Sequence, residues 1–304
     1  MDIAQLNQRF GAPGRIVFRS GFAGYPTAVL ANRFGTAEVS LLGGNVLSYR
    51  PTGHSPVVFR PAKGDEEYNR GDKFHGGIPV CWPQFGNRFS KELPQHGFAS
   101  KLVFDVRGTE YSEEKTELML GIRSSDETKS LWPHDFDLEL KVSVTMKLNL
   151  SLTTKNTGAE AFEFSCGFHP YFILRDRDAA SVRGVDGLEC ILAQRDCDLG
   201  VRCGDLVLDH APDDVFVLPD SPKHEFAILD PGLRRAIAVV SSGNTREVVW
   251  NCGDEKLSDC GPEDWRRFVC VEPVSDWPGG RTLAPGESYS LVAAIQSVME
   301  EVNK

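Results

Sequence analysis

The sequence predicts an all-β protein, a large antiparallel β-sandwich, and three observations support this fold class. Apolar and polar residues alternate with a period of two in many segments, most clearly from Phe136 to Leu152, and this is the spacing of a strand with one buried face. Gly, Pro, Asn and Asp separate these segments, as turns require. Helical periodicity is sparse, and strands do not alternate with helices as they would around a parallel sheet.

The predicted elements begin with a helix at Ile3–Phe10, after which strands follow along most of the chain. The stretch Phe136–Leu152 is longer than an ordinary strand, so it either turns tightly near Met146-Lys147 or forms one long curved strand. A helical turn is expected around Gly261–Arg267, and a helical pattern also touches the last few residues. The shorter predicted strands are Ile16–Phe18, Ala37–Leu42, Leu102–Arg107, Glu117–Ile122, Glu163–Cys166, Ala236–Val240, Val248–Trp250, Phe268–Val271 and Ser288–Ala293.

Composition and charge restrict the class of protein. The chain has 304 residues, 41% of them hydrophobic and 25% charged, which is ordinary for a globular protein. No linker or internal repeat divides it, so we expect a single domain over residues 1–304, and a monomer. The net charge of −10 and the lack of a basic tract disfavour nucleic acid as a partner.

The start of the chain, MDIAQLNQRF, lacks the basic region and the apolar stretch of a signal peptide, and no apolar run approaches the length of a membrane span. We therefore expect a cytoplasmic protein with no membrane partner. The eight cysteines include no Cys-x-x-Cys pair, which indicates free thiols.

Common catalytic signatures are missing from the sequence. It contains no GxGxxG, GxxxxGK[ST], HExxH or GxSxG motif and no cysteine cluster with zinc spacing. Nucleotide, metal and serine-nucleophile functions are all disfavoured together. We accordingly expect neither a cofactor nor a resident metal.

Two segments are unusually rich in Gly, Pro, His and aromatic residues. The first covers residues 74–88 and 93–99, and the second covers residues 166–172. Flat rings beside a closely approaching backbone are typical of a sugar site. Each residue also has a structural interpretation: His169 as a buried, hydrogen-bonded core residue, His96 as a turn residue, and the glycines and prolines as parts of loops.

Glu272 ends the apolar run Phe268–Val271 and is followed by Pro273. If its carboxylate is partly desolvated, its pKa rises toward the range useful to a general base. The alternative is a carboxylate at the end of a strand that meets only solvent or an arginine.

Taken together, these segments resemble the aldose 1-epimerase family, and most closely its glucose-6-phosphate 1-epimerase branch. The resemblance spans most of the chain and implies a galactose-mutarotase-like β-supersandwich. It rests on HGGIPVCWPQFG at 75–86, LPQHGFA at 93–99, LWPHDF at 131–136, GFHPYF at 167–172, Asp213-Asp214-Val215, and CVEP at 270–273.

The resemblance also implies roles for site residues. His169 would donate a proton to the ring oxygen of a hexose and Glu272 would accept the proton of the anomeric hydroxyl, so that the ring opens and recloses as the other anomer without a cofactor. His96 and Gln95 would hold the ring-oxygen side and neighbouring hydroxyls, and Asp214 would accept a hydrogen bond from a hydroxyl. The same resemblance suggests that two aromatic residues wall the site, with core packing as the alternative for the second: Trp82 and Phe168.

The chain departs from the phosphate-preferring branch at two positions, where His75 and Ser100 replace its usual arginines. Neither reproduces the fork with which arginine binds phosphate. One hypothesis is that His75 together with Arg88 or Lys101 still receives a phosphate, and the alternative is that these charges are solvated.

Three functions stay open at this stage. The first is a mutarotase of a hexose 6-phosphate or of free glucose or galactose, and the second is a catalytically silent sugar-binding protein. The third is a lyase or hydrolase with a carboxylate pair, which needs a second acid near Glu272. Candidates for that acid are Asp214, Asp254 and Asp276.

Overall fold

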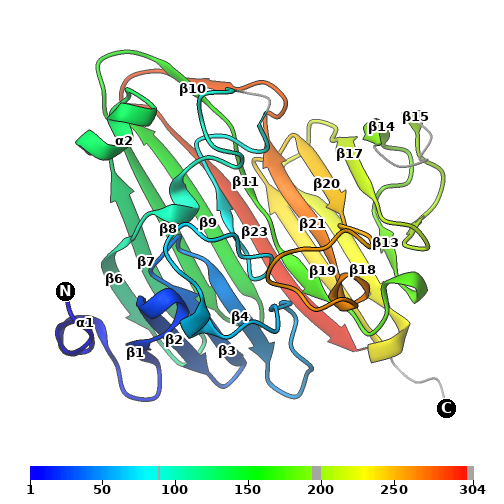
Figure 1. The fold of residues 1–304 in the computed structure, drawn as a ribbon, viewed down its shortest axis with the longest axis horizontal. Helices are drawn as coiled ribbons and strands as arrows, with labels where there is room; N and C mark the ends of the chain where they lie inside the picture. The colour runs from blue at the N-terminus through cyan, green and yellow to red at the C-terminus, as the bar shows by residue number, and fades with distance from the viewer. Residues whose placement is uncertain (88–89, 194–199, 300–304) are drawn as a thin grey trace.

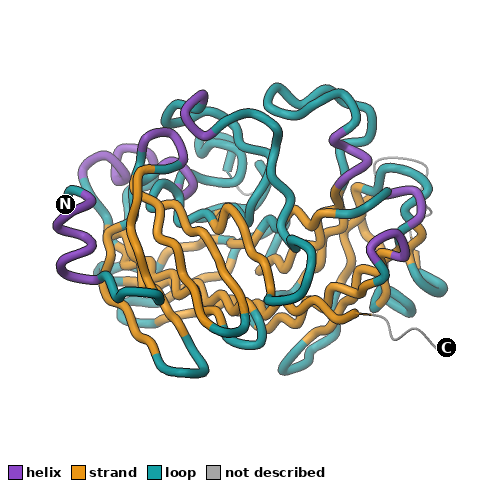
Figure 2. The backbone as a smooth tube through the Cα atoms, turned by 90° about the horizontal axis from the view of Figure 1, so that it is seen from below, coloured by secondary structure: helices purple, strands orange, loops and turns teal. Residues whose placement is uncertain are grey.

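The computed structural model describes residues 1–87, 90–193 and 200–299, and within them the strands form four antiparallel sheets with few helices (Figure 1). The predicted all-β sandwich is confirmed. Figure 2 shows the layered strands, with the long loops and short helical turns gathered along one side of them. The sheets therefore form the scaffold of the molecule, and functional residues can lie in the loops that this scaffold positions.

The largest sheet has nine strands. In spatial order they are β16 (Leu206–Val207), β13 (Ser181–Arg183), β18 (His224–Asp230), β19 (Arg235–Ser242), β23 (Ser288–Met299), β9 (Leu148–Asn156), β8 (Phe136–Val144), β7 (Thr116–Arg123) and β6 (Asp105–Tyr111). The long alternating stretch turns between β8 and β9, with Val144 paired to Leu148. Of the two alternatives, the tight turn near Met146-Lys147 is the one that forms.

The second large sheet has eight strands. They are β15 (Gly200–Val201), β14 (Glu189–Ala193), β17 (Asp213–Val217), β20 (Arg246–Trp250), β21 (Phe268–Ser275), β11 (Cys166–Phe168) and β5 (Val80–Cys81), with β12 (Tyr171–Ile173) paired beside β11 on β21. The predicted strand Glu163–Cys166 is wrong in its bounds, because Ser165 separates β11 from β10 (Phe162–Phe164), which pairs with β22 (Arg281–Leu283) in a sheet of its own.

The four-stranded sheet consists of β1 (Ile16–Ser20), β2 (Pro26–Asn32), β3 (Gly35–Ser40) and β4 (Val46–Pro51). The four-stranded sheet packs on the nine-stranded sheet near β7 and β8. The eight-stranded sheet packs on the nine-stranded sheet near β23. Inward side chains of all three sheets join one hydrophobic cluster that includes Leu30, Leu140 and Val271. Each fully buried side chain of this kind contributes about 1.5–3 kcal/mol, so this shared core holds the layers together.

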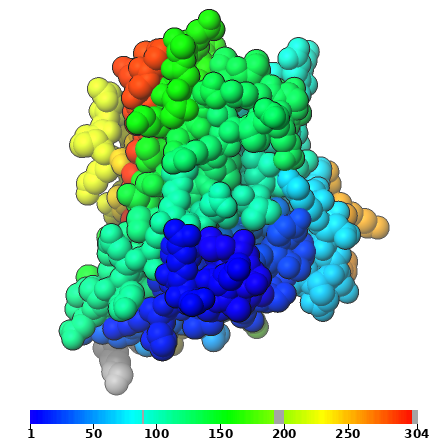
Figure 3. Space-filling model, turned by 90° about the vertical axis from the view of Figure 1, so that its left-hand side faces the viewer, coloured from blue at the N-terminus to red at the C-terminus, as the bar shows by residue number. Residues whose placement is uncertain are grey.

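Helix α1 (Ile3–Phe10) forms as predicted and begins at a capping box, in which Asp2 accepts from the Gln5 amide while the Gln5 side chain accepts from the Asp2 amide. Figure 3 shows the N-terminal residues packed on the side of the molecule beside β6, where Thr109 donates a hydrogen bond to the carbonyl oxygen of Phe10. Helix α2 covers Asp126–Leu131, and the turn expected around Gly261–Arg267 is a short 3-10 helix.

Among the described residues, no helix combines the length and the apolar character that a membrane crossing requires. No disulfide joins the cysteines of this part of the chain, and Cys197 lies outside it. The helical pattern expected at the last few residues falls mostly on residues 300–304, which also lie outside the described residues.

Candidate active site

A cavity of about 650 Å³ lies on the face of the eight-stranded sheet that is turned away from the nine-stranded sheet. Its walls come from β17, β20 and β21, from the loops of residues 69–87 and 94–101, and from the segment of residues 169–171. Such a volume is typical of a small-molecule site. Both segments that are rich in Gly, Pro, His and aromatic residues border this cavity; we call them the histidine-containing segments.

Strand alternation decides which side chains reach the cavity. Val215 pairs with Val248, and Val248 pairs with Glu272. Side chains at alternate positions of a strand lie on the same face. Asp213, Val215, Val248, Trp250 and Glu272 therefore line the cavity together.

Asp214 requires a correction, because the structure places it on the opposite face of β17. It pairs with Val249, a member of the main core, and it is 1% exposed. The neighbouring Asp213 stands in the cavity wall instead. Two consecutive aspartates of a strand point to opposite faces, and the sequence contains no signal for which of them faces the site.

His169 lies in the short gap between β11 and β12, and both of these strands pair with β21. Gly167 pairs with Val274, and Tyr171 pairs with Cys270. His169 lies midway between Gly167 and Tyr171, and Glu272 lies midway between Cys270 and Val274, so the register places His169 opposite Glu272. One strand thereby positions both groups, although 103 residues separate them in the chain.

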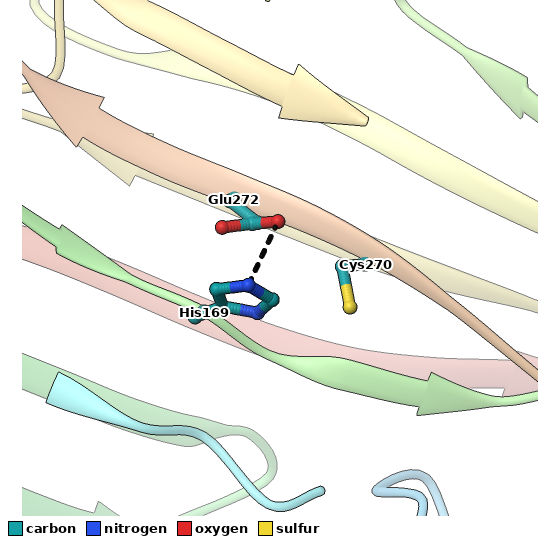
Figure 4. Close-up of side chains that lie close together, drawn as sticks. All are labelled: His169, Cys270 and Glu272. Carbon is teal, nitrogen blue, oxygen red and sulfur yellow. Dashed lines mark ion pairs between the residues drawn. The ribbon is translucent and has the colours of Figure 1, made fainter. Parts of the chain in front are cut away.

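The two side chains meet at the cavity floor. Nε2 of His169 lies 3.5 Å from Oε1 of Glu272, and the side chains are 12% and 1% exposed (Figure 4). The imidazole stacks on the ring of Tyr171, with centroids 4.8 Å apart and planes at 13°. The His169 amide donates to the carbonyl oxygen of Pro79. Stacking and backbone contacts together fix the orientation of the imidazole.

Burial shifts both proton affinities toward the neutral forms. Desolvation, with the nearby Asp213 and Glu247 carboxylates, raises the pKa of Glu272 well above its ordinary value. Desolvation lowers the pKa of His169 well below its ordinary value, and repulsion from the His96 ring in its protonated form acts in the same direction. A pair that jointly holds one proton is neutral overall whichever group carries it, so burial favours this one-proton form.

His96 also lines the cavity, and its ring lies edge-on to that of His169 with centroids 5.3 Å apart. Its Nδ1 accepts from the Gly86 amide at 3.2 Å, which leaves the proton of a neutral imidazole on Nε2. Burial, followed by the charge of Lys73, lowers the pKa of His96 to about 4. At neutral pH His96 is thus an uncharged hydrogen-bond donor.

Gly97 follows His96 at φ +74, and a Cβ there would lie 2.1 Å from the carbonyl oxygen of Trp82. Only glycine fits this close approach. Nearby, Nε2 of the Gln84 side chain donates to the carbonyl oxygens of Leu93 and Pro94. These contacts join the two halves of the first histidine-containing segment and hold His96 at the cavity.

His75 lines the cavity and belongs to a network that the sequence analysis missed. Its Nδ1 lies 2.6 Å from Oδ1 of Asp259, its amide donates to Oδ2 of the same carboxylate, and the Tyr68 hydroxyl donates to Oδ2 at 3.1 Å. Burial alone would raise the pKa of Asp259, but the hydrogen bonds from His75 lower it. The carboxylate therefore stays ionised and orients the His75 ring.

The remaining predicted residues divide into two groups. Gln95, Ser100 and Lys101 border the cavity, as does Lys73. Arg88 lies outside the described residues.

The aromatic wall is not the one suggested by the sequence. Trp82 is fully buried in the main core, where its Nε1 donates to Thr154 at 2.9 Å, and Phe168 is also a core residue. Phe85, Trp250 and Tyr171 line the cavity instead. Trp250 could have been found from the alternation along its strand, since it lies two residues beyond Val248.

Comparison with known proteins gives one family. The family model described as aldose 1-epimerase matches residues 26–296. A protein of Cenchrus ciliaris named "putative glucose-6-phosphate 1-epimerase" is 28% identical over 86% of this chain and 81% of its own length. A protein of Escherichia coli K12 with the same name is 29% identical over 78% of each chain.

Solved structures agree on the fold. A crystal structure titled as a putative mutarotase from Salmonella typhimurium superposes with a TM-score of 0.85, at 24% identity, over 96% of both chains. A galactose mutarotase-like protein from Clostridium acetobutylicum superposes with a TM-score of 0.76, at 17% identity, over 93% of this chain and 98% of its own. The predicted galactose-mutarotase-like fold is thereby confirmed.

Proposed function

This chain belongs to the aldose 1-epimerase family of isomerases, and from that premise we propose that His169 and Glu272 carry out the anomer exchange. The observation that carries the proposal is their placement, with Nε2 and Oε1 3.5 Å apart on the floor of the cavity. The ring oxygen and the anomeric hydroxyl of an aldose are bonded to the same carbon. A donor and an acceptor this close together reach both.

The reaction follows from the two groups. The Glu272 carboxylate takes the proton of the anomeric hydroxyl while the His169 imidazolium gives its proton to the ring oxygen, and the bond between C1 and that oxygen breaks. Rotation about C1–C2 presents the other face of the aldehyde. The reverse transfers then close the ring as the opposite anomer.

The electrostatics of the site support this scheme. The two pKa shifts place the single proton of the resting pair on Glu272. Ring opening therefore begins after that proton has moved to His169, and it ends with one proton on Glu272 again. Burial favours this one-proton form, and the pair carries no net charge in the low-dielectric site either before or after ring opening. General acid or base catalysis of this kind contributes about 10²–10⁴-fold for each group.

We further propose that the substrate is a hexose 6-phosphate, such as glucose 6-phosphate. His75, held by Asp259, borders the cavity together with Lys73 and Lys101. The two lysines offer positive charge and all three groups offer N–H donors, in a chain whose net charge is −10, and phosphate binds by such contacts. The names of the two curated relatives point the same way.

Anomer exchange measured by NMR tests the roles of the pair. His169→Asn and Glu272→Gln should each lower the exchange rate by about 10²–10⁴-fold. Glu117→Gln is a control, because Glu117 is a partly buried carboxyl on β7 of the nine-stranded sheet, pairs with Lys115 and lies outside the cavity lining. His134→Asn serves in the same way for the imidazole. Wild-type exchange in both site variants would overturn the assignment.

Substrate preference is tested separately with glucose 6-phosphate, glucose and galactose on the wild-type protein. The proposal expects a higher kcat/KM for the phosphate ester than for either free sugar. Equal values would remove the phosphate claim and leave a mutarotase of free aldoses.

A further inference from the structure

We propose that the site also binds a zinc-class divalent ion through His169, Cys270 and Glu272, and that this ion blocks anomer exchange. The Nε2 or Nδ1 of His169, the Sγ of Cys270 and a carboxylate oxygen of Glu272 all lie within 4.8 Å of one another. Figure 4 shows the thiol beside the imidazole, under the carboxylate of the same strand. The inference adds an inhibitory ligand to the site and assigns the ion no part in the reaction.

The fold creates this triangle through strand alternation. Cys270 and Glu272 are two residues apart on β21 and share a face, and Cys270 pairs with Tyr171 on the strand that follows His169. The sequence analysis found no zinc spacing because two ligands come from a Cys-x-Glu run and the third lies 101 residues before them. Only the pairing of β12 with β21 reveals the set.

The ligand chemistry selects the ion. Zinc accepts imidazole nitrogen, thiolate sulfur and carboxylate oxygen as ligands, with bonds of about 2.0–2.3 Å, and three of them leave a fourth position open. Tetrahedral bonds of that length separate the ligand atoms by about 3–4 Å. The ligand atoms, which now lie within 4.8 Å of one another, would have to draw together by about 1 Å on binding. A hard ion such as Mg²⁺ prefers six oxygen ligands and finds no such set among the three.

Charge and hydrogen bonding favour the ion as well. Oε2 of Glu272 has no hydrogen-bond partner among the described residues although the side chain is buried. Binding displaces the thiol proton of Cys270 and the single proton shared by His169 and Glu272, so two protons pass to solvent. The bound site then contains one dication and two anions and is neutral overall, which a buried site tolerates.

Inhibition follows from geometry. The ion takes the Nε2 or Nδ1 lone pair and the carboxylate oxygens that proton transfer requires, and a sugar can no longer be protonated or deprotonated by them. Cys270 is fully buried and stands outside the cavity lining. Its replacement removes a metal ligand without removing either proton-transfer group.

Cobalt absorption tests the binding without any sugar. Co²⁺ added to the wild-type protein should give a sulfur-to-cobalt charge-transfer band that Zn²⁺ abolishes. Cys252→Ser, which changes another buried thiol packed in the same cluster as Cys270, should keep the band. Cys270→Ser and Cys270→Ala should lose it, and a band that persists in both would overturn the proposal.

Anomer exchange at buffered free Zn²⁺ tests the inhibition. Measured against its own metal-free rate, Cys270→Ser should need at least about tenfold more Zn²⁺ for half-inhibition than the wild type does, in line with the loss of a ligand. Cys252→Ser should keep wild-type sensitivity, and Mg²⁺ should have no effect. Equal Zn²⁺ sensitivity in wild type and Cys270→Ser would refute the site. A failure of the proposed isomerase function would instead appear as an absence of exchange before any metal is added.

Discussion

Replacing Asp259 by asparagine separates recognition of a phosphate from ring opening. The carboxylate of Asp259 holds Nδ1 of His75 at 2.6 Å, and the two side chains are 2% and 17% exposed. The Asp259→Asn variant would keep the shape of the side chain but lose the negative charge that orients the imidazole. His75 would then turn its other nitrogen toward the cavity less often.

The size of the effect follows from the bond that is lost. A hydrogen bond to a charged group contributes about 1.5–3 kcal/mol. Because His75 is partly open to the cavity, we take the lower end of that range, and about 1.5 kcal/mol is roughly tenfold in affinity. KM for glucose 6-phosphate should therefore rise about tenfold in Asp259→Asn, with kcat nearly unchanged. For free glucose, kcat/KM should remain at the wild-type value.

The assay is anomer exchange by NMR with both sugars, and the informative quantity is the ratio of the two kcat/KM values. Tyr68→Phe is a suitable control, because it removes a second hydrogen bond to Asp259 and leaves the contact with His75 in place. The ratio of the two kcat/KM values should change less in Tyr68→Phe than in Asp259→Asn. A fall of equal size on both sugars would mean that Asp259 supports the fold of the loop, and an unchanged KM for the phosphate ester would refute the role of His75.

Three other predictions concern protonation, placement and backbone fit. Burial disfavours both the cationic two-proton form and the anionic proton-free form of the His169–Glu272 pair. The rate of anomer exchange should therefore be constant around neutral pH. It should fall in acid, where the pair gains a second proton, and in base, where the pair loses its only proton. A single step at the ordinary Glu pKa would contradict this. Asp213→Asn should raise KM more than Asp214→Asn does, since only Asp213 lines the cavity, and the reverse order in steady-state kinetics would show that the register argument fails. Gly97→Ala should lower the free energy of unfolding by at least about 1–3 kcal/mol, measured by urea titration, because its Cβ would meet a carbonyl oxygen at 2.1 Å with φ positive; wild-type stability would contradict the strain.

Local periodicity and turn composition were sufficient to predict the fold class. The hairpin joining β8 and β9 is one example, because both its alternation and its turn lie within one stretch of sequence. Glu272 was recognisable in the same way, as an acid at the end of an apolar run. Helix α1 was predicted with its correct bounds, since its capping box is local.

Features that depend on strand pairing could not be predicted. The choice between Asp213 and Asp214 is set by which face of β17 looks outward, and this depends on β20 and β21. Asp259 meets His75 across 184 residues of sequence. The family resemblance suggested Trp82 as a wall of the site, yet its ring turns into the core and donates to Thr154.

The gap between β11 and β12 has a consequence for how this chain can change over time. Both flanks of His169 are tied to the strand that carries Glu272, so the spacing of these two groups does not depend on the loops of residues 69–75 and 94–101. The cavity-lining side chains of those loops can change, and with them the preferred sugar, while the two groups stay in register. Substitutions can thus change the sugar preference of this molecule without changing its ring chemistry.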